Sequence, residues 1–258
     1  MTFNPSPWLA CRLRRPEAGM RLFCFPHSGG SVGEYVRWAD LIPDIEVWGV
    51  QLPGRGSRAE EAPFTRIREL VDALVAAVDF GTRFAFFGHS LGALVAFETA
   101  QRLKELGRAM PDALFLSAAP APQLPPRAIP SSHLDEAGLL TALEPTYGEL
   151  IQELREDAEL RELLLPGLRA DLSLVESYPY EARAPLPCAM TVTGGAQDDL
   201  TREELEAWRV HTTGPFELHL LPGGHFYLRE QKAALLRILG ETLLRSRSPT
   251  VSTKDLKP

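Results

Sequence analysis

A serine flanked by glycines is the residue of this 258-residue chain best placed for nucleophilic chemistry. Ser90 is the centre of the sequence GHSLG at 88–92, which follows an apolar run at 83–87 and precedes a stretch with helical spacing of apolar side chains. Between a strand and a helix, Gly-x-Ser-x-Gly forms a nucleophile elbow, a strained turn that exposes the serine hydroxyl. The sequence therefore predicts that Ser90 is a nucleophile.

A serine hydroxyl needs a general base, and His225 is the histidine whose position fits best. It lies in PGGHF at 222–226, directly after a predicted strand, and two preceding glycines let its loop turn over the sheet edge. It also follows Ser90 in chain order, as a Ser, acid, His triad on such an elbow requires. The remaining histidines are in less suitable positions: His27, His89, His133, His211 and His219.

An acid that orients the base must lie between Ser90 and His225, on a loop that follows a strand. The sequence TGGAQDD at 193–199 meets this requirement and offers two carboxylates. Asp198 ends a tight Gly195-x-x-Asp turn and is the preferred candidate. Asp199 is the alternative, although it could instead support the next helix, for which Thr201-x-x-Glu204 predicts a capping box.

An oxyanion hole requires two backbone N–H groups near the nucleophile. The residue after the serine supplies one, which is Leu91 here. The glycine-rich sequence PHSGG at 26–30, after the first predicted strand, is the candidate source of the other, and Ser28 is the most suitable residue in it. An ordinary turn is the alternative interpretation of this segment.

Strands and helices alternate along the chain, which predicts an α/β fold with a mostly parallel, doubly wound sheet. Strands are expected at Arg21–Pro26, Glu46–Leu52, Arg83–Phe87, Ala113–Ala118, Ala189–Thr193 and Glu217–Leu221. Helices are expected at Ile67–Val78, Leu91–Leu106 with Gly107 as its C-terminal cap, and Ala233–Leu244.

One segment interrupts this alternation. The proline-rich sequence Pro120–Pro130 precedes two Leu- and Glu-rich stretches, Asp135–Leu143 and Glu149–Leu165, that are typical of helices. We expect a single domain over 1–258 with a helical lid inserted at 120–180, covering the strand ends where α/β sheets bind ligands. An extra helical layer without a gating role is the alternative.

Several classes of protein are disfavoured. The net charge of −7 argues against a nucleic-acid-binding surface. The three cysteines lack the spacing of a zinc site or a disulfide framework, and no nucleotide-binding glycine motif or metal-ligand cluster is recognisable, so no cofactor is expected. No run of 18 apolar residues and no secretory signal is visible, which favours a cytoplasmic protein.

Taken together, these motifs resemble the type II thioesterases of polyketide and nonribosomal peptide synthesis. The resemblance covers about residues 20 to 240 and rests on FPHSGGS, GVQLPGRGSR, FFGHSLGALVAFE, LLPGLRADLSLVESY and LPGGHFYL. It implies an α/β-hydrolase fold with a mobile helical lid, the triad Ser90, Asp198 and His225, and oxyanion-hole amides at Ser28 and Leu91. Many relatives have proline directly after the acid, whereas this chain has Asp199.

The same resemblance implies a serine thioesterase that removes acyl groups from the phosphopantetheine arm of acyl or peptidyl carrier proteins, as an editing enzyme of these pathways. A small-ester esterase, an acyltransferase with the same triad, and a noncatalytic binding protein are the alternatives. We expect a monomer. Because carrier proteins are usually acidic, docking should depend on local arginines, for which Arg55, Arg58 and Arg127 are candidates.

Overall fold

A seven-stranded sheet forms the centre of the molecule in a computed structural model, which describes residues 6–125, 127, 129 and 131–245. The strand order is β1-β3-β2-β4-β5-β6-β7, and every neighbouring pair is parallel except β1 with β3. The strands are β1 (Leu9–Cys11), β2 (Arg21–Phe25), β3 (Glu46–Val50), β4 (Phe84–His89), β5 (Ala113–Ser117), β6 (Ala189–Gly195) and β7 (Phe216–Leu221). The predicted α/β fold with a mostly parallel sheet is confirmed.

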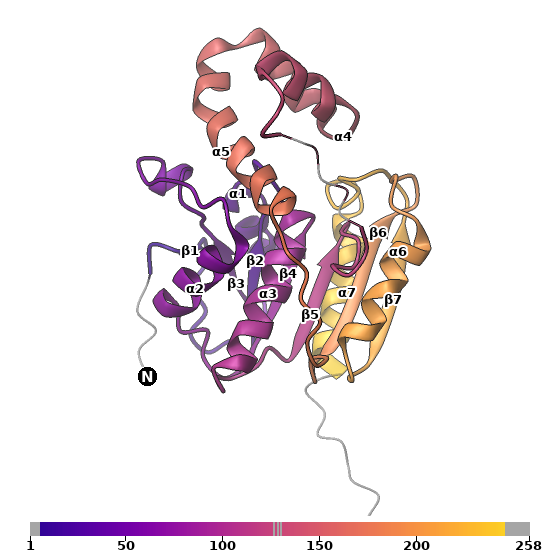
Figure 1. The fold of residues 1–258 in the computed structure, drawn as a ribbon. Helices are drawn as coiled ribbons and strands as arrows, with labels where there is room; N and C mark the ends of the chain where they lie inside the picture. The colour runs from indigo at the N-terminus through magenta and orange to yellow at the C-terminus, as the bar shows by residue number, and fades with distance from the viewer. Residues whose placement is uncertain (1–5, 126, 128, 130, 246–258) are drawn as a thin grey trace, which may run out of the picture.

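The inner strands are continuous apolar runs because helices cover both of their faces. All residues of β3, β4 and β5 are buried. One apolar cluster lies between the sheet and α2 (Ile67–Ala77) and α3 (Leu91–Glu105), and a second lies on the other face. That second face is covered by α1 (Val32–Val36) and α7 (Lys232–Arg245). Figure 1 shows this three-layer arrangement.

Short helical segments complete the connections between strands. They are η1 (Arg37–Asp40), η2 (Gly56–Arg58), α6 (Arg202–Glu206) and η3 (Ala207–His211). Gly107 follows α3 with φ +62° and donates its N–H to Lys104 O, so the predicted helix cap is confirmed. The strand β1, which pairs antiparallel at the sheet edge, was not predicted, because three residues carry too little pattern.

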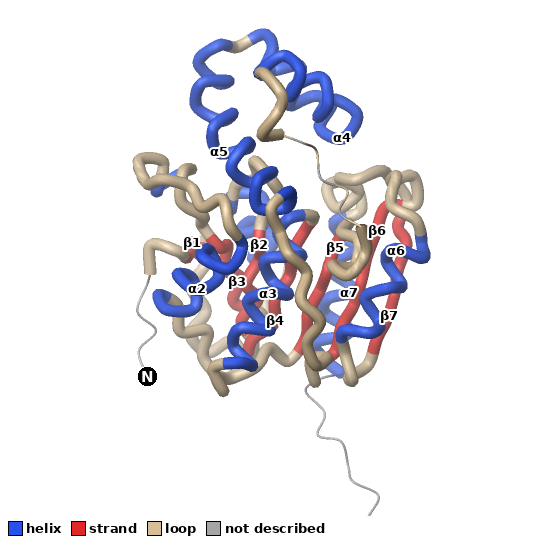
Figure 2. Tube along the Cα trace, in the orientation of Figure 1, coloured by secondary structure: helices blue, strands red, loops and turns tan. Residues whose placement is uncertain are grey.

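Between β5 and β6 the chain forms two long helices, α4 (Glu136–Glu156) and α5 (Ala158–Glu176), which we call the helical insertion. The insertion has its own apolar cluster and lies above one end of the sheet (Figures 1 and 2). The prediction of two helices, Asp135–Leu143 and Glu149–Leu165, is correct in placing an interruption near Gly148, where the backbone of α4 leaves helical geometry (φ 28°, ψ −97°). It is wrong in its second helix, because the chain breaks again at Asp157, whose side chain accepts the N–H of Leu160, and α5 continues to Glu176.

Part of the predicted 120–130 segment, at residues 126, 128 and 130, lies outside the described residues. Among the residues that the structure describes, no helix has both the length and the apolar character needed to cross a bilayer.

Candidate active site

Ser90 occupies the turn between β4 and α3, as predicted. Its backbone has φ 55° and ψ −120°, and among described residues only Ala118 shares a positive φ without being glycine. The Ser90 N–H donates to Ser117 O at 2.8 Å, and Ser90 O accepts from the N–H of Ala93. A non-glycine residue in this region of φ is strained, so the surrounding structure must hold it there.

Two glycines make this turn sterically possible. A Cβ at Gly88 would lie 2.1 Å from Gly92 O, and a Cβ at Gly92 would lie 2.0 Å from Phe25 O. The first turn of α3 therefore contacts the ends of β2 and β4 backbone to backbone. This close approach brings the loop after β2 next to Ser90.

His225 and Asp198 lie on loops that follow the neighbouring strands β7 and β6. The His225 Nδ1 is 2.9 Å from Asp198 Oδ2, and the side chains are 15% and 7% exposed. The Asp198 N–H donates to Gly195 O, which forms the predicted tight turn. A carboxylate at Nδ1 holds the proton on that nitrogen and leaves Nε2 free to accept one.

The second carboxylate of the pair, Asp199, is exposed, and the carboxylate that contacts His225 is that of Asp198. The predicted capping box of α6 is present: Thr201 Oγ1 accepts the N–H of Glu204, whose carboxylate accepts the N–H of Thr201.

A buried polar network beneath these residues was not predicted from the sequence. The ring of His89 lies 5.2 Å from that of His225, and its Nδ1 is 2.8 Å from Ser117 Oγ. Burial holds the pKa of His89 well below its ordinary value, so this histidine is neutral. Ser117 also contacts the hydroxyl of Tyr227, which donates to Thr193 Oγ1 at 2.6 Å, and burial raises the pKa of Tyr227 to about 12.

One cavity of about 510 Å³ brings all five predicted site residues together. It is lined by Ser28, Ser90, Leu91, Asp198 and His225. The helical insertion also contributes to its walls, through Ala142, Pro145, Thr146, Tyr147, Leu172 and Val175. Ser28 itself is 3% exposed, and its side chain is hydrogen-bonded to the hydroxyl of Tyr147.

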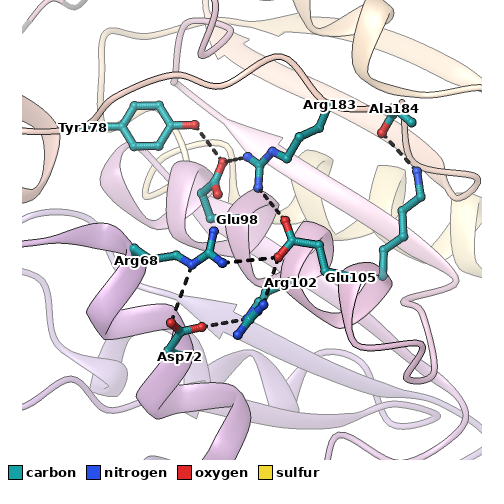
Figure 3. Close-up of polar contacts among 9 residues, drawn as sticks. Arg68, Asp72, Glu98, Arg102, Glu105, Tyr178, Arg183 and Ala184 are labelled. Atoms are coloured by element: carbon teal, nitrogen blue, oxygen red, sulfur yellow. Dashed lines mark hydrogen bonds and ion pairs between the residues drawn. The ribbon is translucent and has the colours of Figure 1, made fainter.

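The segment after α5 is tied to the helix that Ser90 precedes. The hydroxyl of Tyr178, another cavity residue, donates to Glu98 Oε1 at 2.7 Å, and the same oxygen pairs with Arg183 (Figure 3). Burial and the neighbouring Glu98 raise the pKa of Tyr178, so its hydroxyl stays a donor. Arg183 also pairs with Glu105, further along α3.

Two of the three arginines expected to dock a carrier protein do not face solvent, and for them the expectation is wrong. The Arg55 side chain is 12% exposed and pairs with Asp171, and that of Arg58 is 7% exposed, pairs with Glu61 and stacks on Trp8. Arg127 is 45% exposed and pairs with Glu204. Within the described part of the chain, no group of three or more His, Cys, Asp or Glu side chains is arranged to hold a metal ion.

Comparison with known proteins gives one family. Residues 20–243 match the family model described as the thioesterase domain. The chain is 41% identical to the linear gramicidin dehydrogenase LgrE of Brevibacillus parabrevis, covering 93% of this chain and 94% of that one. It is 38% identical to the thioesterase PikA5 of Streptomyces venezuelae, covering 90% and 84%. The RedJ thioesterase of the prodiginine pathway in Streptomyces coelicolor superposes with a TM-score of 0.82 at 36% identity, covering 88% and 87%.

Proposed function

The chain belongs to the thioesterase domain family, and from this premise we propose that it hydrolyses acyl thioesters through a covalent acyl-enzyme on Ser90. The observation that supports this mechanism best is the Asp198–His225 pair, which shares one cavity with a serine on a strained turn. A similar solved structure, the type II thioesterase YbtT of the yersiniabactin NRPS/PKS pathway, supports hydrolysis in that context.

In the proposed reaction, Nε2 of His225 removes the hydroxyl proton of Ser90 while Oγ attacks the thioester carbonyl. The N–H groups of Ser28 and Leu91 stabilise the oxyanion. The C–S bond breaks and the thiolate takes the proton from His225. Water then attacks the acyl-serine, giving its proton to the same imidazole, and the acid leaves as Ser90 is reprotonated. Throughout, Asp198 stabilises the imidazolium.

The proposed substrate is an acyl group on the phosphopantetheine arm of a carrier protein, and the enzyme acts as a cytoplasmic monomer that clears such groups. Aliphatic side chains in the cavity, such as Leu94, Leu124 and Leu172, suit an acyl chain. The helical insertion would act as a lid that admits it. Because the chain has a net charge of −7, long-range attraction cannot guide an acidic carrier, which leaves Arg127 as the remaining candidate contact from the sequence.

The relative LgrE is named a dehydrogenase, but the glycine-rich segment after β3 in this chain does not have the geometry of a dinucleotide site. A dinucleotide site needs a glycine-rich turn that opens a long helix, whose N-terminus faces the pyrophosphate. The glycine-rich segment after β3 leads instead into η2, which is three residues long, and the Arg58 side chain at its end is buried.

Mass spectrometry of acylated carrier proteins, incubated with the enzyme, tests the proposed reaction. We expect release of the free acid by the wild type and a loss of about 10⁴–10⁶ in kcat for Ser90→Ala. A fluorophosphonate should label the wild type at Ser90 only. Ser173→Ala, which removes a helix-internal hydroxyl bonded to Arg169 O, is the matched control and should behave as wild type. Hydrolysis at the wild-type rate by folded Ser90→Ala would refute the mechanism.

The carrier partner has a separate test. The same acyl group is offered on a carrier protein and on N-acetylcysteamine, and kcat/KM should be higher for the carrier, because remote contacts orient the reacting carbonyl. Equal values would favour a general esterase, and acyl transfer to an added alcohol in preference to water would favour an acyltransferase.

A further inference from the structure

A buried carboxylate on the helical insertion contacts the loop that contains Ser28. Asp171 lies on α5 among the apolar residues of the insertion and is 1% exposed. An ionised carboxylate is stable at such a site only when it is paired and hydrogen-bonded. Arg55 provides the pairing, with Nη2 at 2.5 Å from Asp171 Oδ1 and Nη1 at 2.7 Å from Oδ2.

The third hydrogen bond of Asp171 reaches the proposed oxyanion loop. The Gly29 N–H donates to Asp171 Oδ2 at 2.8 Å, across 142 residues of sequence. The Ser28 carbonyl, at the opposite end of the same peptide group, accepts from His27 Nδ1 at 2.9 Å. Because a trans peptide is planar, these two contacts fix the orientation of the peptide between Ser28 and Gly29.

The preceding peptide, which carries the Ser28 N–H, is held in the same way. Its carbonyl, His27 O, accepts the N–H of Gly30 at 2.8 Å. Arg55 also donates to Gly30 O at 3.3 Å, so the Arg55–Asp171 pair contacts the loop on both sides of Gly29. The loop is pressed against α5, where a Cβ at Gly29 would lie 3.2 Å from Leu168 Cδ1.

We propose that Asp171 is a positioning residue for the oxyanion hole. By accepting the Gly29 N–H it orients the loop that carries the Ser28 N–H, and so makes the hole depend on α5 being seated. This inference rests on the acyl-enzyme mechanism proposed above. Arg55 has a second role in it. A bare carboxylate bonded to the loop of the oxyanion hole would oppose the developing negative charge, and the bidentate guanidinium of Arg55 offsets that carboxylate's charge.

Kinetics of an acyl N-acetylcysteamine thioester, normalised by active-site titration, tests the proposal. Removal of one oxyanion donor typically costs about 10²–10³ in kcat, so Asp171→Ala, which only misplaces a donor, should cost about 10–100-fold with little change in KM. Asp171→Asn should recover part of the loss, because its amide oxygen still accepts the Gly29 N–H. Asp157→Asn, at the N-terminal cap of the same helix, is the matched control and should retain wild-type kcat.

Two inhibitors separate positioning from general stability. An alkyl trifluoromethyl ketone forms a tetrahedral oxyanion on Ser90, and its affinity should fall by the same factor as kcat in Asp171→Ala. The corresponding thioether has no carbonyl, and its affinity should not change. Arg55→Lys keeps the charge but loses the bidentate geometry, so its affinity for the ketone should fall while its affinity for the thioether should not change. This variant replaces Asp171→Ala in the test if Asp171→Ala does not fold.

Wild-type kcat and ketone affinity in Asp171→Ala would overturn the inference, as would equal losses for the ketone and the thioether. If Asp171→Ala does not fold, wild-type ketone affinity in Arg55→Lys would do the same. These outcomes leave the proposed function intact, provided that the wild type forms the ketone adduct on Ser90. A wild type that forms no adduct on Ser90 would overturn the proposed function and this inference together.

Discussion

The two halves of the candidate active site are held by different parts of the molecule. Asp198 and His225, the base half, lie on loops of adjacent parallel strands, and those loops bond to each other through Ala196 N–H to Leu221 O and Gln197 N–H to Gly223 O. The loop of the proposed oxyanion half, at Ser28 and Gly29, is held by its own hydrogen bonds, by Arg55 and by side chains from the helical insertion.

The base half is therefore preorganised by the sheet, whereas the oxyanion half would depend on the position of the insertion. The sheet should keep the base half in place whether or not the insertion is seated, because Met190–Gly195 of β6 pairs with all of β7. The oxyanion half needs contacts that are distant in sequence, from Tyr147 on α4 and Asp171 on α5. Movement of the insertion should therefore change stabilisation of the transition state more than it changes the basicity of His225.

The largest expected effect comes from breaking the base half. Asp198→Asn should lower kcat by about 10⁴, because the imidazole loses the group that fixes its tautomer. Asp199→Asn is the matched control, and should leave kcat near the wild-type value because this side chain is exposed. Steady-state kinetics on both variants decides the assignment, and an inactive Asp199→Asn with an active Asp198→Asn would reverse it.

Glu98→Gln should destabilise the fold without disabling either half. It breaks a mostly buried pair with Arg183, and we expect the free energy of unfolding to fall by about 2–3 kcal/mol, less than for a fully buried pair. Glu105→Gln, whose own side chain is 32% exposed, should cost about 1 kcal/mol or less. Urea unfolding measures both. A strong decrease in kcat of folded Glu98→Gln would contradict this expectation, and would mean that the contacts of Glu98 with Tyr178 and Arg183 are coupled to the chemistry.

Tyr147→Phe should affect the oxyanion half alone. It removes the hydrogen bond to the Ser28 side chain, and the net value of such a bond predicts a decrease of about 2–10-fold in kcat. Tyr180→Phe, on another wall of the same cavity, is the control. The prediction fails if the two variants have equal kcat, or if Tyr147→Phe changes KM alone.

The smallest effect is a pH dependence of stability outside both halves. Burial lowers the pKa of His211 to about 4 in the folded state, from 6.5 when exposed. The unfolded chain therefore binds the extra proton between these values, and stability that is present above pH 6.5 is lost as the pH falls toward 4. We expect a loss of about 0.7 kcal/mol between pH 7 and pH 6. Urea unfolding at the two pH values should show this difference in the wild type and not in His211→Gln, and an unchanged slope in His211→Gln would exclude His211 as its source.

The base half and the elbow could be predicted from the sequence because local rules govern them. Glycines that permit close approach surround Ser90, and apolar runs place His225 and Asp198 after strands. The roles of Arg55 and Asp171 could not be predicted in this way, because their contact joins residues 116 positions apart. One signal was available: Asp171 has the helical spacing of the apolar face that includes Leu168 and Leu172, where a carboxylate must have a partner.

The second predicted helix of the insertion was wrong for a related reason. Gly148 is a strong local signal for ending a helix, and the backbone leaves helical geometry there, near the predicted gap. The further break at Asp157 was missed, because the cap that Asp157 provides to Leu160 lies inside a stretch whose apolar residues recur at helical spacing. Leu143, Ile151 and Leu168 pack in one cluster across these helices, and no local pattern contains that information.

The separate apolar cluster of the helical insertion has a consequence for how such an enzyme can diverge. Its side chains pack on one another rather than on the clusters that flank the sheet. A mutation there should reshape the roof of the cavity and leave the two sheet clusters unchanged, although Phe226, next to His225, also packs against this cluster. New acyl preferences are therefore accessible by single steps that keep the enzyme folded and active at each stage. That freedom ends at Asp171 and Tyr147, which contact the loop of Ser28 and Gly29.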